Sequence, residues 1–286
     1  MQGKRLPDGA RAAAVKDRTG LHAAPWMALV RHRSLTLELA KRDVLGRYRG
    51  ASFGLLWSLI SPFLLLCIYT FALGTVMRGR WPQIESGEAS FSIILFAGLI
   101  VHGLFAECLV RAPGLVVANT NFVKRIIFPL EILPWPMVLS ALFHTLMNVL
   151  VFVALRLVID GEFSWTIVLL PLVLLPMVVL ILGVSWFLAS LGVYVRDVAQ
   201  VTGVASMALL FLSSAMMPVE NVPQAYRWVF EMNPLTPMID QARNVMLWGR
   251  LPDWTVLGRY LLLATGVMYL GHAWFRVTRR GFADVL

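Results

Sequence analysis

The sequence lacks the patterns with which a chain cradles nucleotide phosphates or holds a zinc ion. None of its 286 residues belongs to a G-x-x-x-x-G-K-[ST] loop, and no H-x-x-x-H or C-x-x-C spacing occurs. Its only cysteines, Cys67 and Cys108, lie in apolar stretches, where free cysteine behaves as a small hydrophobic residue. We therefore expect no metal, no bound cofactor and no enzymatic activity in this chain. Any ATP and Mg²⁺ that its function requires would be bound by another subunit.

Charged residues are also scarce in this sequence. Asp, Glu, Lys and Arg make up 14% of the chain, whereas soluble domains carry about 25%, and 58% of the residues are hydrophobic. No charge occurs between Arg49 and Arg78, a run longer than the roughly 20 apolar residues that cross a hydrocarbon core. The composition predicts a membrane protein. The net charge of +9 does not indicate nucleic-acid binding, because eleven of the 25 basic residues lie within the first fifty positions, beside this run.

Charge-poor windows predict an all-α polytopic protein with six transmembrane helices. The windows are approximately residues 52–76, 90–110, 132–155, 166–193, 198–217 and 254–275. Only Tyr194-Val195-Arg196-Asp197 separates the fourth from the fifth. We interpret it as a tight turn, because charges at the bilayer centre would cost about 2.5 to 3.5 kcal/mol each. Lys and Arg gather in the N-terminal arm, in residues 111–131 and in the C-terminal tail, so both termini are predicted to be cytoplasmic.

The chain divides into four parts. These are a flexible tail at 1–30, an amphipathic cytoplasmic interface helix at 31–50, a transmembrane domain at 51–276 and a cytoplasmic tail at 277–286. Basic residues surround the apolar side of the second part, as in helices that lie in the membrane surface; that side consists of Leu35, Leu39, Val44 and Leu45. Glycine then recurs at every fourth position, which suits either close helix packing or a hinge, at Gly46, Gly50 and Gly54.

The last outer loop, residues 218–253, is too apolar for a solvated loop and too often interrupted by proline for a spanning helix. Two short re-entrant or interfacial helices that meet near Asn233-Pro234 would fit it, because non-helical backbone at membrane depth must be covered by protein or line a water cavity. An amphipathic segment on the membrane surface is the alternative.

Few polar side chains lie within the predicted spans. Glu107 and Arg111 are four residues apart and can pair on one helix face, and His144 and Asn148 have the same spacing. We interpret the first two as an interfacial ion pair and the other two as groups that form interhelical hydrogen bonds. The sequence has no acidic residue near the middle of a span, where ion-coupled carriers use one, so a proton-driven carrier is disfavoured.

Three segments resemble the ABC-2 type permeases that export polysaccharide. Residues 47–62, R-Y-R-G-A-S-F-G-L-L-W-S-L-I-S-P, are similar to the family signature R-Y-[KR]-x-[ST]-x-L-G-x-L-W-x-x-x-x-P. Phe53 stands where that signature has leucine, and Ala51 where it has Ser or Thr. Residues 121–129, followed by Leu133-Pro134, and residues 233–237, N-P-L-T-P, are similar to later segments of the family and occur in the same order.

The resemblance implies a homodimer of six-span subunits in the bacterial inner membrane. It would be docked on two cytoplasmic ABC ATPase subunits and would export O-antigen, teichoic acid or capsule on a lipid carrier. Aromatic rings in spans can stack on sugars, although more often they pack or anchor at interfaces. The implied substrate path comprises Arg47, Arg49, Phe53, Trp57, Tyr69, Phe71 and Phe211. The implied ATPase-coupling segment comprises Asn121, Phe122, Lys124, Arg125 and Phe128. The implied outer gate comprises Trp228, Phe230, Asn233 and Pro234.

Two other classes of function stay open on the sequence. The same fold could export a drug, an antibiotic or a haem-like small molecule, and neighbouring genes would discriminate between these cargoes. A membrane enzyme acting on polyprenyl-linked sugars would need an acidic or histidine motif at a membrane face. The outer acids form no such motif; they are Glu220, Glu231, Asp240 and Asp253.

Overall fold

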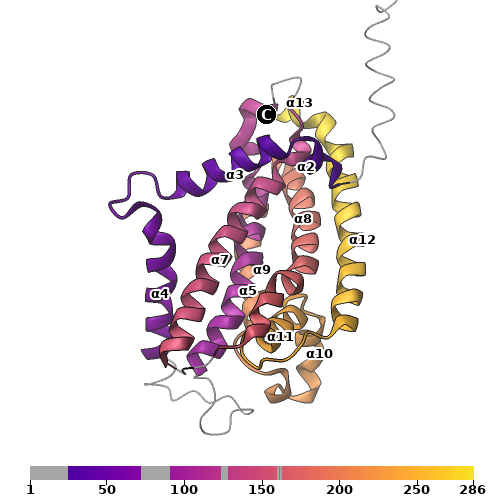
Figure 1. The fold of residues 1–286 in the computed structure, drawn as a ribbon. Coiled ribbons are helices and arrows are strands. Elements are labelled where there is room, and N and C mark those ends of the chain that lie inside the picture. The colour runs from indigo at the N-terminus through magenta and orange to yellow at the C-terminus, as the bar shows by residue number, and fades with distance from the viewer. Residues whose placement is uncertain (1–24, 72–90, 124–127, 160, 162) are drawn as a thin grey trace, which may run out of the picture.

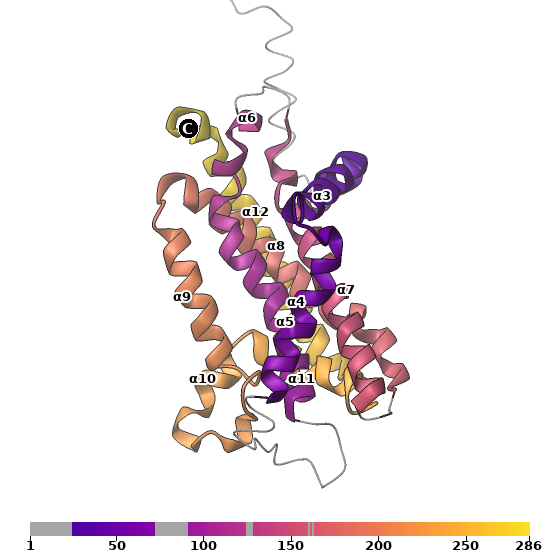
Figure 2. The same ribbon diagram turned by 90° about the vertical axis from the view of Figure 1, so that its left-hand side faces the viewer.

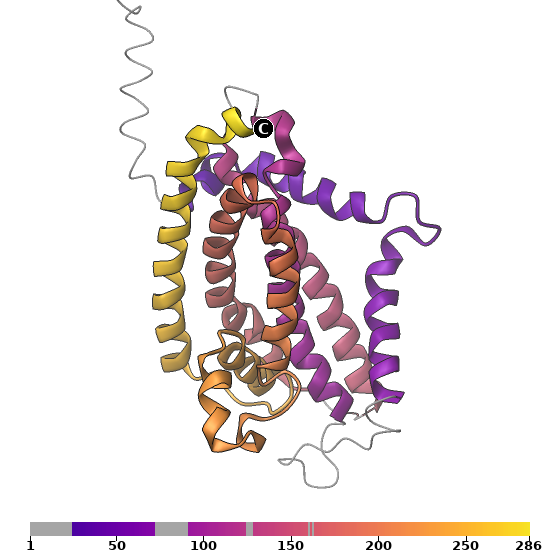
Figure 3. The same cartoon turned by 180° about the vertical axis from the view of Figure 1, so that it is seen from behind.

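The computed structural model describes residues 25–71, 91–123, 128–159, 161 and 163–286, and these residues form helices and turns without a strand. Six of the helices run lengthwise beside one another (Figures 1 and 3). They are α4 (Trp57–Tyr69), α5 (Phe91–Arg111), α7 (Pro134–Ile159), α8 (Leu170–Tyr194), α9 (Val198–Phe211) and α12 (Trp254–Thr278). The predicted all-α fold class is confirmed for this part of the chain.

Shorter helices cover the two ends of this bundle. Helix α3 (Arg33–Arg47) follows the short α2 (Met27–Arg31) and lies across one end, which we call the α3 end (Figure 1). Helices α10 (Arg227–Met232) and α11 (Leu235–Met246) lie at the opposite end, which we call the α11 end. The short helices α6 (Thr120–Val123) and α13 (Phe282–Val285) are at the α3 end (Figures 1 and 2).

Three helices have the length and hydropathy of a membrane span, which makes the chain a multi-pass membrane protein. With their flanking turns they are Phe91–Gly114, Leu130–Val158 and Trp165–Tyr194. The apolar helices Gly54–Tyr69 and Val198–Phe211 are shorter, and residues 72–76 of the first predicted span lie outside the described residues. Spans one, five and six therefore stay predictions. The predicted break between windows four and five is confirmed, since α8 ends at Tyr194 and α9 begins at Val198.

Helix α5 is the central element of the bundle. Its side chains Ile94, Ala97, Val101 and Cys108 are fully buried, and the helix packs against α7, α8, α9 and α11. An apolar helix can be surrounded in this way because it has no polar face to present to solvent. Polar side chains at the two ends of α5 are consequently held in fixed positions relative to every neighbouring helix.

Gly50 and Gly54 turn the chain from α3 into α4. Their φ angles, 86° and 48°, lie in the left-handed region, and no atom is within 4 Å of a Cβ built on either residue. This segment is therefore a bend and not a close helix contact. Residues 50–54 also read G-A-S-F-G, which formally matches the G-x-S-x-G nucleophile elbow. That motif needs a strand-to-helix turn, whereas these residues join two helices.

Helix α3 packs against α7 through Thr36, Leu39 and Ala40, which are buried. The apolar side predicted for this helix is only partly correct. Leu39 is buried, but Leu45 is 50% exposed. The difference arises because α3 packs on α7. The side of α3 that contacts α7 includes Thr36 and Ala40, which are therefore buried in addition to Leu39.

Candidate functional site

Glu107 of α5 is the centre of a polar cluster at the α3 end. Its Oε1 accepts a hydrogen bond from Arg47 Nη2 of α3 at 2.7 Å and one from Arg111 Nη1 of α5 at 2.9 Å. His144 of α7 places Nδ1 at 3.2 Å from both carboxylate oxygens. Three helices therefore meet at one carboxylate whose side chain is 17% exposed.

Asp43 of α3 supplies the second acid of the cluster. Its two carboxylate oxygens accept from Arg111 Nη2 at 2.7 and 2.6 Å. Arg111 thereby joins Asp43 to Glu107 and fastens α3 to α5 at a second point. The two acids balance Arg47 and Arg111, so the cluster is neutral overall when His144 is uncharged.

The tautomer of a neutral His144 ring follows from its surroundings. Its Nδ1 lies 3.1 Å from Arg47 Nη1 as well as near Glu107, so it could accept from the arginine or donate to the acid. Its Nε2 is buried and has no hydrogen-bond partner among the described residues. A buried N–H without an acceptor is rarer than a buried acceptor without a donor. For a neutral ring this favours the tautomer with its proton on Nδ1, which donates to Glu107.

Tyr48 adjoins this cluster just after the end of α3. Its ring lies edge-on to the ring of His144, with the centroids 6.0 Å apart. Burial raises the pKa of the Tyr48 hydroxyl, so this side chain stays protonated near neutral pH. The Glu107 carboxylate thus has a neutral aromatic neighbour in addition to its cationic ones.

The sequence revealed part of this cluster. The Glu107–Arg111 pair predicted from the spacing of four residues is confirmed. His144 makes the predicted interhelical contact, whereas Asn148 forms no hydrogen bond within the described part of the chain. Arg47 was predicted to lie in a substrate path. Its ion pair with Glu107 could not be predicted, because the two residues are 60 positions apart in the sequence. The side chain of Arg47 is 41% exposed, so one side of it faces outward from the cluster.

The aromatic residues predicted to line a substrate path do not form one patch within a single chain. Phe53 is 58% exposed and lies edge-on to Trp57 at 5.9 Å, beside the α3 end of α4. Tyr69 and Phe71, the latter 67% exposed, are at the other end of α4. Phe211, 54% exposed, ends α9, and α5 lies between α9 and α4 (Figure 2). Arg49 is exposed in the bend before α4.

The predicted ATPase-coupling segment lies beside α3. Phe122 of α6 stacks on Phe128, with centroids 4.3 Å apart and planes 9° apart, and Arg42 of α3 lies 5.9 Å above the Phe122 ring. Asn121 is exposed in α6. Lys124 and Arg125 lie outside the described residues. The stacked pair thus joins the segment to the helix that carries Asp43 and Arg47.

The α11 end is held by buried polar groups. Asn233 donates through Nδ2 to the carbonyls of Leu209 and Leu212 at 2.9 and 2.8 Å, and its Oδ1 accepts from the Leu235 amide. Asn233 and Pro234 join α10 to α11, so the predicted pair of short helices meeting there is observed. Of the other predicted gate residues, Phe230 is buried and Trp228 is 59% exposed.

Two buried arginines that the sequence did not single out bind α11 to the bundle. Arg243 donates to the carbonyls of Ile94, Ser214 and Ala215 at 3.2, 2.6 and 2.9 Å. Arg156 of α7 donates to the carbonyls of Met246 and Leu247. Each arginine is 4% exposed. The acceptors of these hydrogen bonds are backbone carbonyls, whose positions residue type does not reveal, so no sequence pattern could have identified these bonds. Arg243 also lies 3.9 Å from Asp240, three residues before it.

No group of three or more His, Cys, Asp or Glu side chains capable of holding a metal ion occurs among the described residues. Another acid at the α3 end, Glu131, pairs with Arg279 at 2.8 Å and Arg276 at 3.5 Å. The polar groups of this end therefore form ion pairs between helices. Their arrangement is suited to fixing and transmitting helix positions.

Comparison with known proteins agrees with this arrangement. The family model described as ABC-2 type transporter matches residues 34–247. The chain is 24% identical over 254 residues to an O-antigen export system permease protein of Klebsiella pneumoniae, with 88% of this chain and 95% of the relative covered. It is 22% identical to one of Myxococcus xanthus, with 90% and 96% covered. It is 27% identical to the polysialic acid transport protein of Escherichia coli, with 85% and 93% covered.

Proposed function

Because the chain belongs to the ABC-2 type transporter family, we propose that it is the transmembrane permease of an ATP-driven exporter of lipid-linked polysaccharide, with O-antigen as the first candidate cargo. The observation that carries the proposal is that relatives named for O-antigen export and polysialic acid transport align with 85–90% of the chain. The exporter signature in residues 47–62 supports the same cargo class. Export of a drug or antibiotic has no comparable support.

The proposed topology has six spans, with the α3 end in the cytoplasm of a bacterial cell and the α11 end outside its inner membrane. Basic residues support this orientation. Those of α2 and α3, Arg111 at the end of α5 and the arginines at the end of α12 and just after it lie at the α3 end, and in the sequence Lys124 and Arg125 directly follow α6. Helices α10 and α11 would then be re-entrant helices of the outer leaflet. Their buried polar contacts support this, since every backbone group at membrane depth needs a partner.

Permeases of this family normally work with ABC ATPase subunits, and this chain has no P-loop of its own. We place two such subunits, which bind the ATP and Mg²⁺, under a homodimer of this chain. Residues 121–128 would receive their motion, through Asn121, Phe122, Phe128 and the basic pair Lys124 and Arg125. The Phe122–Phe128 stack and Arg42 would pass this motion to α3.

Helix α3 would transmit the movement into the bundle through its ion pairs. Asp43 and Arg47 bind Arg111 and Glu107 on α5, and α5 reaches the α11 end, where its Ile94 carbonyl holds Arg243. These contacts would form a continuous route from the proposed ATPase side to the proposed outer gate helices. The lipid-linked glycan would enter near Arg47 and Arg49 and pass the aromatic residues of α4 and α9 at the dimer seam.

Deletion of the gene in its native host tests the proposed cargo. We expect surface polysaccharide to disappear while lipid-linked glycan accumulates inside the cell, and the wild-type gene to restore both. The double variant Lys124→Glu/Arg125→Glu should be made and inserted in the membrane but fail to restore export. Unchanged surface glycan after deletion would refute the polysaccharide assignment, and full rescue by the double variant would refute the docking assignment alone.

A further inference from the structure

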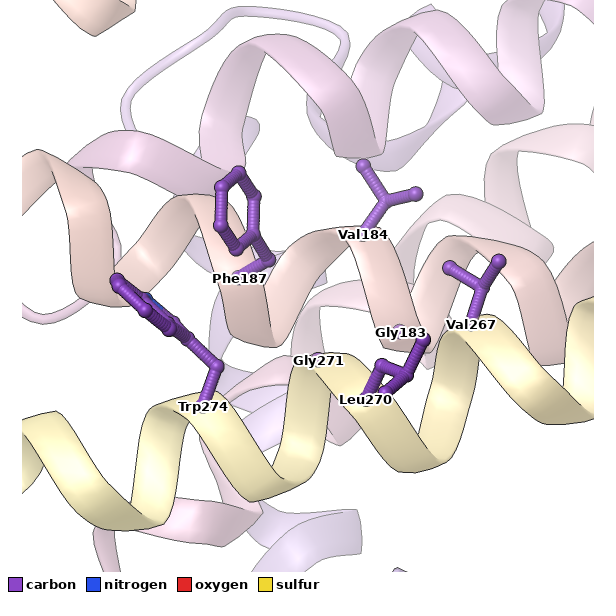
Figure 4. Close-up of a pocket in the computed structure, with 7 residues that line it drawn as sticks. All are labelled: Gly183, Val184, Phe187, Val267, Leu270, Gly271 and Trp274. Atoms are coloured by element: carbon purple, nitrogen blue, oxygen red, sulfur yellow. The ribbon is translucent and has the colours of Figure 1, made fainter.

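A groove with a volume of about 370 Å³ runs along the seam of α8 and α12, on the side of the bundle away from α4 (Figures 1 and 4). Gly183 and Gly271 form its floor. A Cβ on Gly271 would overlap the carbonyl oxygen of Gly183, so the two backbones touch there. Phe187 and Trp274 face each other at one end, with ring centroids 5.8 Å apart.

With α8 and α12 as membrane spans, the groove would face the hydrocarbon of one leaflet. Leu270 and Trp274 on its rim are 73% and 46% exposed. From Val267 to Trp274 it extends about 10 Å along α12 at 1.5 Å per residue, which is less than half of a hydrocarbon core of about 30 Å. Trp274 lies one turn before the end of α12 at Thr278. The groove would therefore lie in the leaflet next to the α3 end.

The seam becomes polar immediately beyond Trp274. The hydroxyls of Ser190 and Thr278 share a hydrogen bond, and the Tyr194 hydroxyl donates to the Thr278 carbonyl at 2.8 Å. Trp and Tyr at this position are typical of the level of lipid head groups. The apolar groove thus leads past amphipathic side chains to hydroxyl groups. A phospholipid has the same order of polarity, from its acyl chains to its head group.

Basic side chains follow the polar end of the seam. Arg196, in the turn after α8, and Arg280, just after α12, are both exposed, and within the described residues neither is paired with the nearby acids Asp197 and Asp284. The adjacent Arg276 and Arg279 are instead bound to Glu131. Basic pockets between transmembrane helices on one membrane face bind the head groups of anionic lipids.

We infer that the seam of α8 and α12 is a binding site for an anionic phospholipid. One acyl chain lies along the groove between Phe187 and Val267, and the lipid phosphate meets Arg280 and Arg196 beyond Trp274. The bound lipid is an ordinary component of the membrane and not the exported cargo. The inference therefore requires only that α8 and α12 span a membrane. It places the lipid against the most extensive helix pair of the described fold, where it would stabilise the contact of Gly183 with Gly271.

Photo-cross-linking tests the site. The full-length permease, with its ATPase subunit if they purify together, is reconstituted in phosphatidylcholine vesicles that contain phosphatidylglycerol with a diazirine in one acyl chain. We expect labelled peptides from residues 183–194 and 267–278. Arg280→Gln should reduce this labelling about fivefold, the effect of one basic residue near a membrane surface. Val267→Phe, which fills the groove, should reduce it at least as far.

Matched variants separate the site from general lipid contact. Arg259→Gln removes an exposed arginine at the other end of α12, and Leu262→Phe introduces the same side chain on another face of that helix. Neither should change the labelling of the groove. Equal labelling by a diazirine phosphatidylcholine, or equal loss in the control variants, would overturn the inference. So would disulfide cross-linking between copies through Leu270→Cys in a Cys67→Ser background, because a second copy would then cover the groove.

Export assays on the same variants keep the two proposals apart. Wild-type surface glycan in a strain whose permease no longer binds the lipid would leave the exporter assignment intact. Conversely, specific lipid labelling is expected even if the cargo proves not to be a polysaccharide.

Discussion

Arg47 and Glu107 form an ion pair at 2.7 Å that joins a helix lying across one end of the bundle to the helix at its centre (Figure 1). The arginine comes from the last turn of α3, and the acid comes from the end of α5. Arg111 and His144 bind the same carboxylate, so α3, α5 and α7 share one acceptor. Because the carboxylate is mostly buried, loss of its charge would weaken the hydrogen bonds that it accepts from the two arginines.

Replacement of this acid is expected to loosen α3. Glu107→Gln keeps the shape of the side chain but removes the charge, so the hydrogen bonds from Arg47 and Arg111 weaken. We expect the free energy of unfolding to fall by about 2 kcal/mol and Tm to fall by about 5 °C. Thermal unfolding of the purified variant in detergent measures this. Glu38→Gln, at an exposed acid of α3, is the control and should leave Tm unchanged; equal shifts in both variants would contradict the role of the cluster.

Two glycine substitutions in α12 are expected to change the stability of the fold in opposite directions. A Cβ on Gly271 would overlap Gly183 of α8, so Gly271→Ala must push the two helices apart at a cost of about 1 to 3 kcal/mol. No atom lies within 4 Å of a Cβ at Gly266, so Gly266→Ala should stabilise the helix by up to about 1 kcal/mol. Tm should fall in the first variant and rise in the second. A rise in both would mean that the α8 and α12 backbones do not touch.

Replacement of Arg243 by lysine is expected to destabilise the fold, although lysine keeps the positive charge. It donates to carbonyls of Ile94, Ser214 and Ala215 from three different nitrogens, which the compact ammonium group of lysine cannot reproduce. Arg243→Lys leaves buried acceptors unpaired and should cost about 3 kcal/mol. Arg259→Lys, at an exposed position, is the control. Limited proteolysis should cleave the region of α10 and α11 in the first variant only, and equal resistance of the two variants would refute the clamp.

The residues that could be predicted from the sequence are those whose partners are local. Glu107 and Arg111 are one helical turn apart, and the junction at Asn233-Pro234 follows from the fixed φ of proline, so spacing and residue type were sufficient. Asp43 lies 68 residues from Arg111, and Arg243 binds backbone carbonyls as far as 149 residues away. These contacts depend on how the helices pack, which neither hydropathy nor charge pattern specifies.

The start of α12 is expected to depend on pH through Asp253. Hydrogen bonds from the Thr255 hydroxyl, then from the Thr255 and Val256 amides, hold the pKa of this N-cap carboxyl below its usual value. Because the pKa of this carboxyl is lower in the folded state than in the unfolded state, its ionised form stabilises the fold. The stabilisation is fully present above the unfolded-state pKa of about 3.9 and is lost as the pH falls through the folded-state pKa.

Substitution at Asp253 measures that contribution. At pH 7 the Asp253→Ala variant should have a lower Tm than the wild type, and the difference should narrow as pH falls below about 4. Asp253→Asn caps the helix without titrating, so its Tm advantage over alanine should persist to low pH. A difference between wild type and Asp253→Ala that stays constant from pH 7 to pH 3 would contradict the capping role.

The contact between α6 and α3 is expected to matter for export more than for stability. Phe122 stacks on Phe128 and lies under Arg42, so Phe122→Ala removes the ring that joins the proposed ATPase-docking segment to α3. The ion pairs of α3 with α5 remain, so the bundle itself should stay folded. We expect normal amounts of permease in the membrane, a Tm within a few degrees of wild type, and loss of most surface glycan with accumulation of lipid-linked glycan inside.

The control for this variant is an equal truncation at the opposite end of the bundle. Phe163 is 57% exposed in the turn before α8, and Phe163→Ala should leave export unchanged. ATP hydrolysis by the purified complex gives a second readout: it should continue in Phe122→Ala without supporting export, because the ATPase cycle no longer moves α3. If Phe122→Ala exported normally, motion would have to reach the bundle without α3. The route from Arg42 through Asp43 and Arg47 to α5 would then be wrong, although the ion pairs themselves would stand.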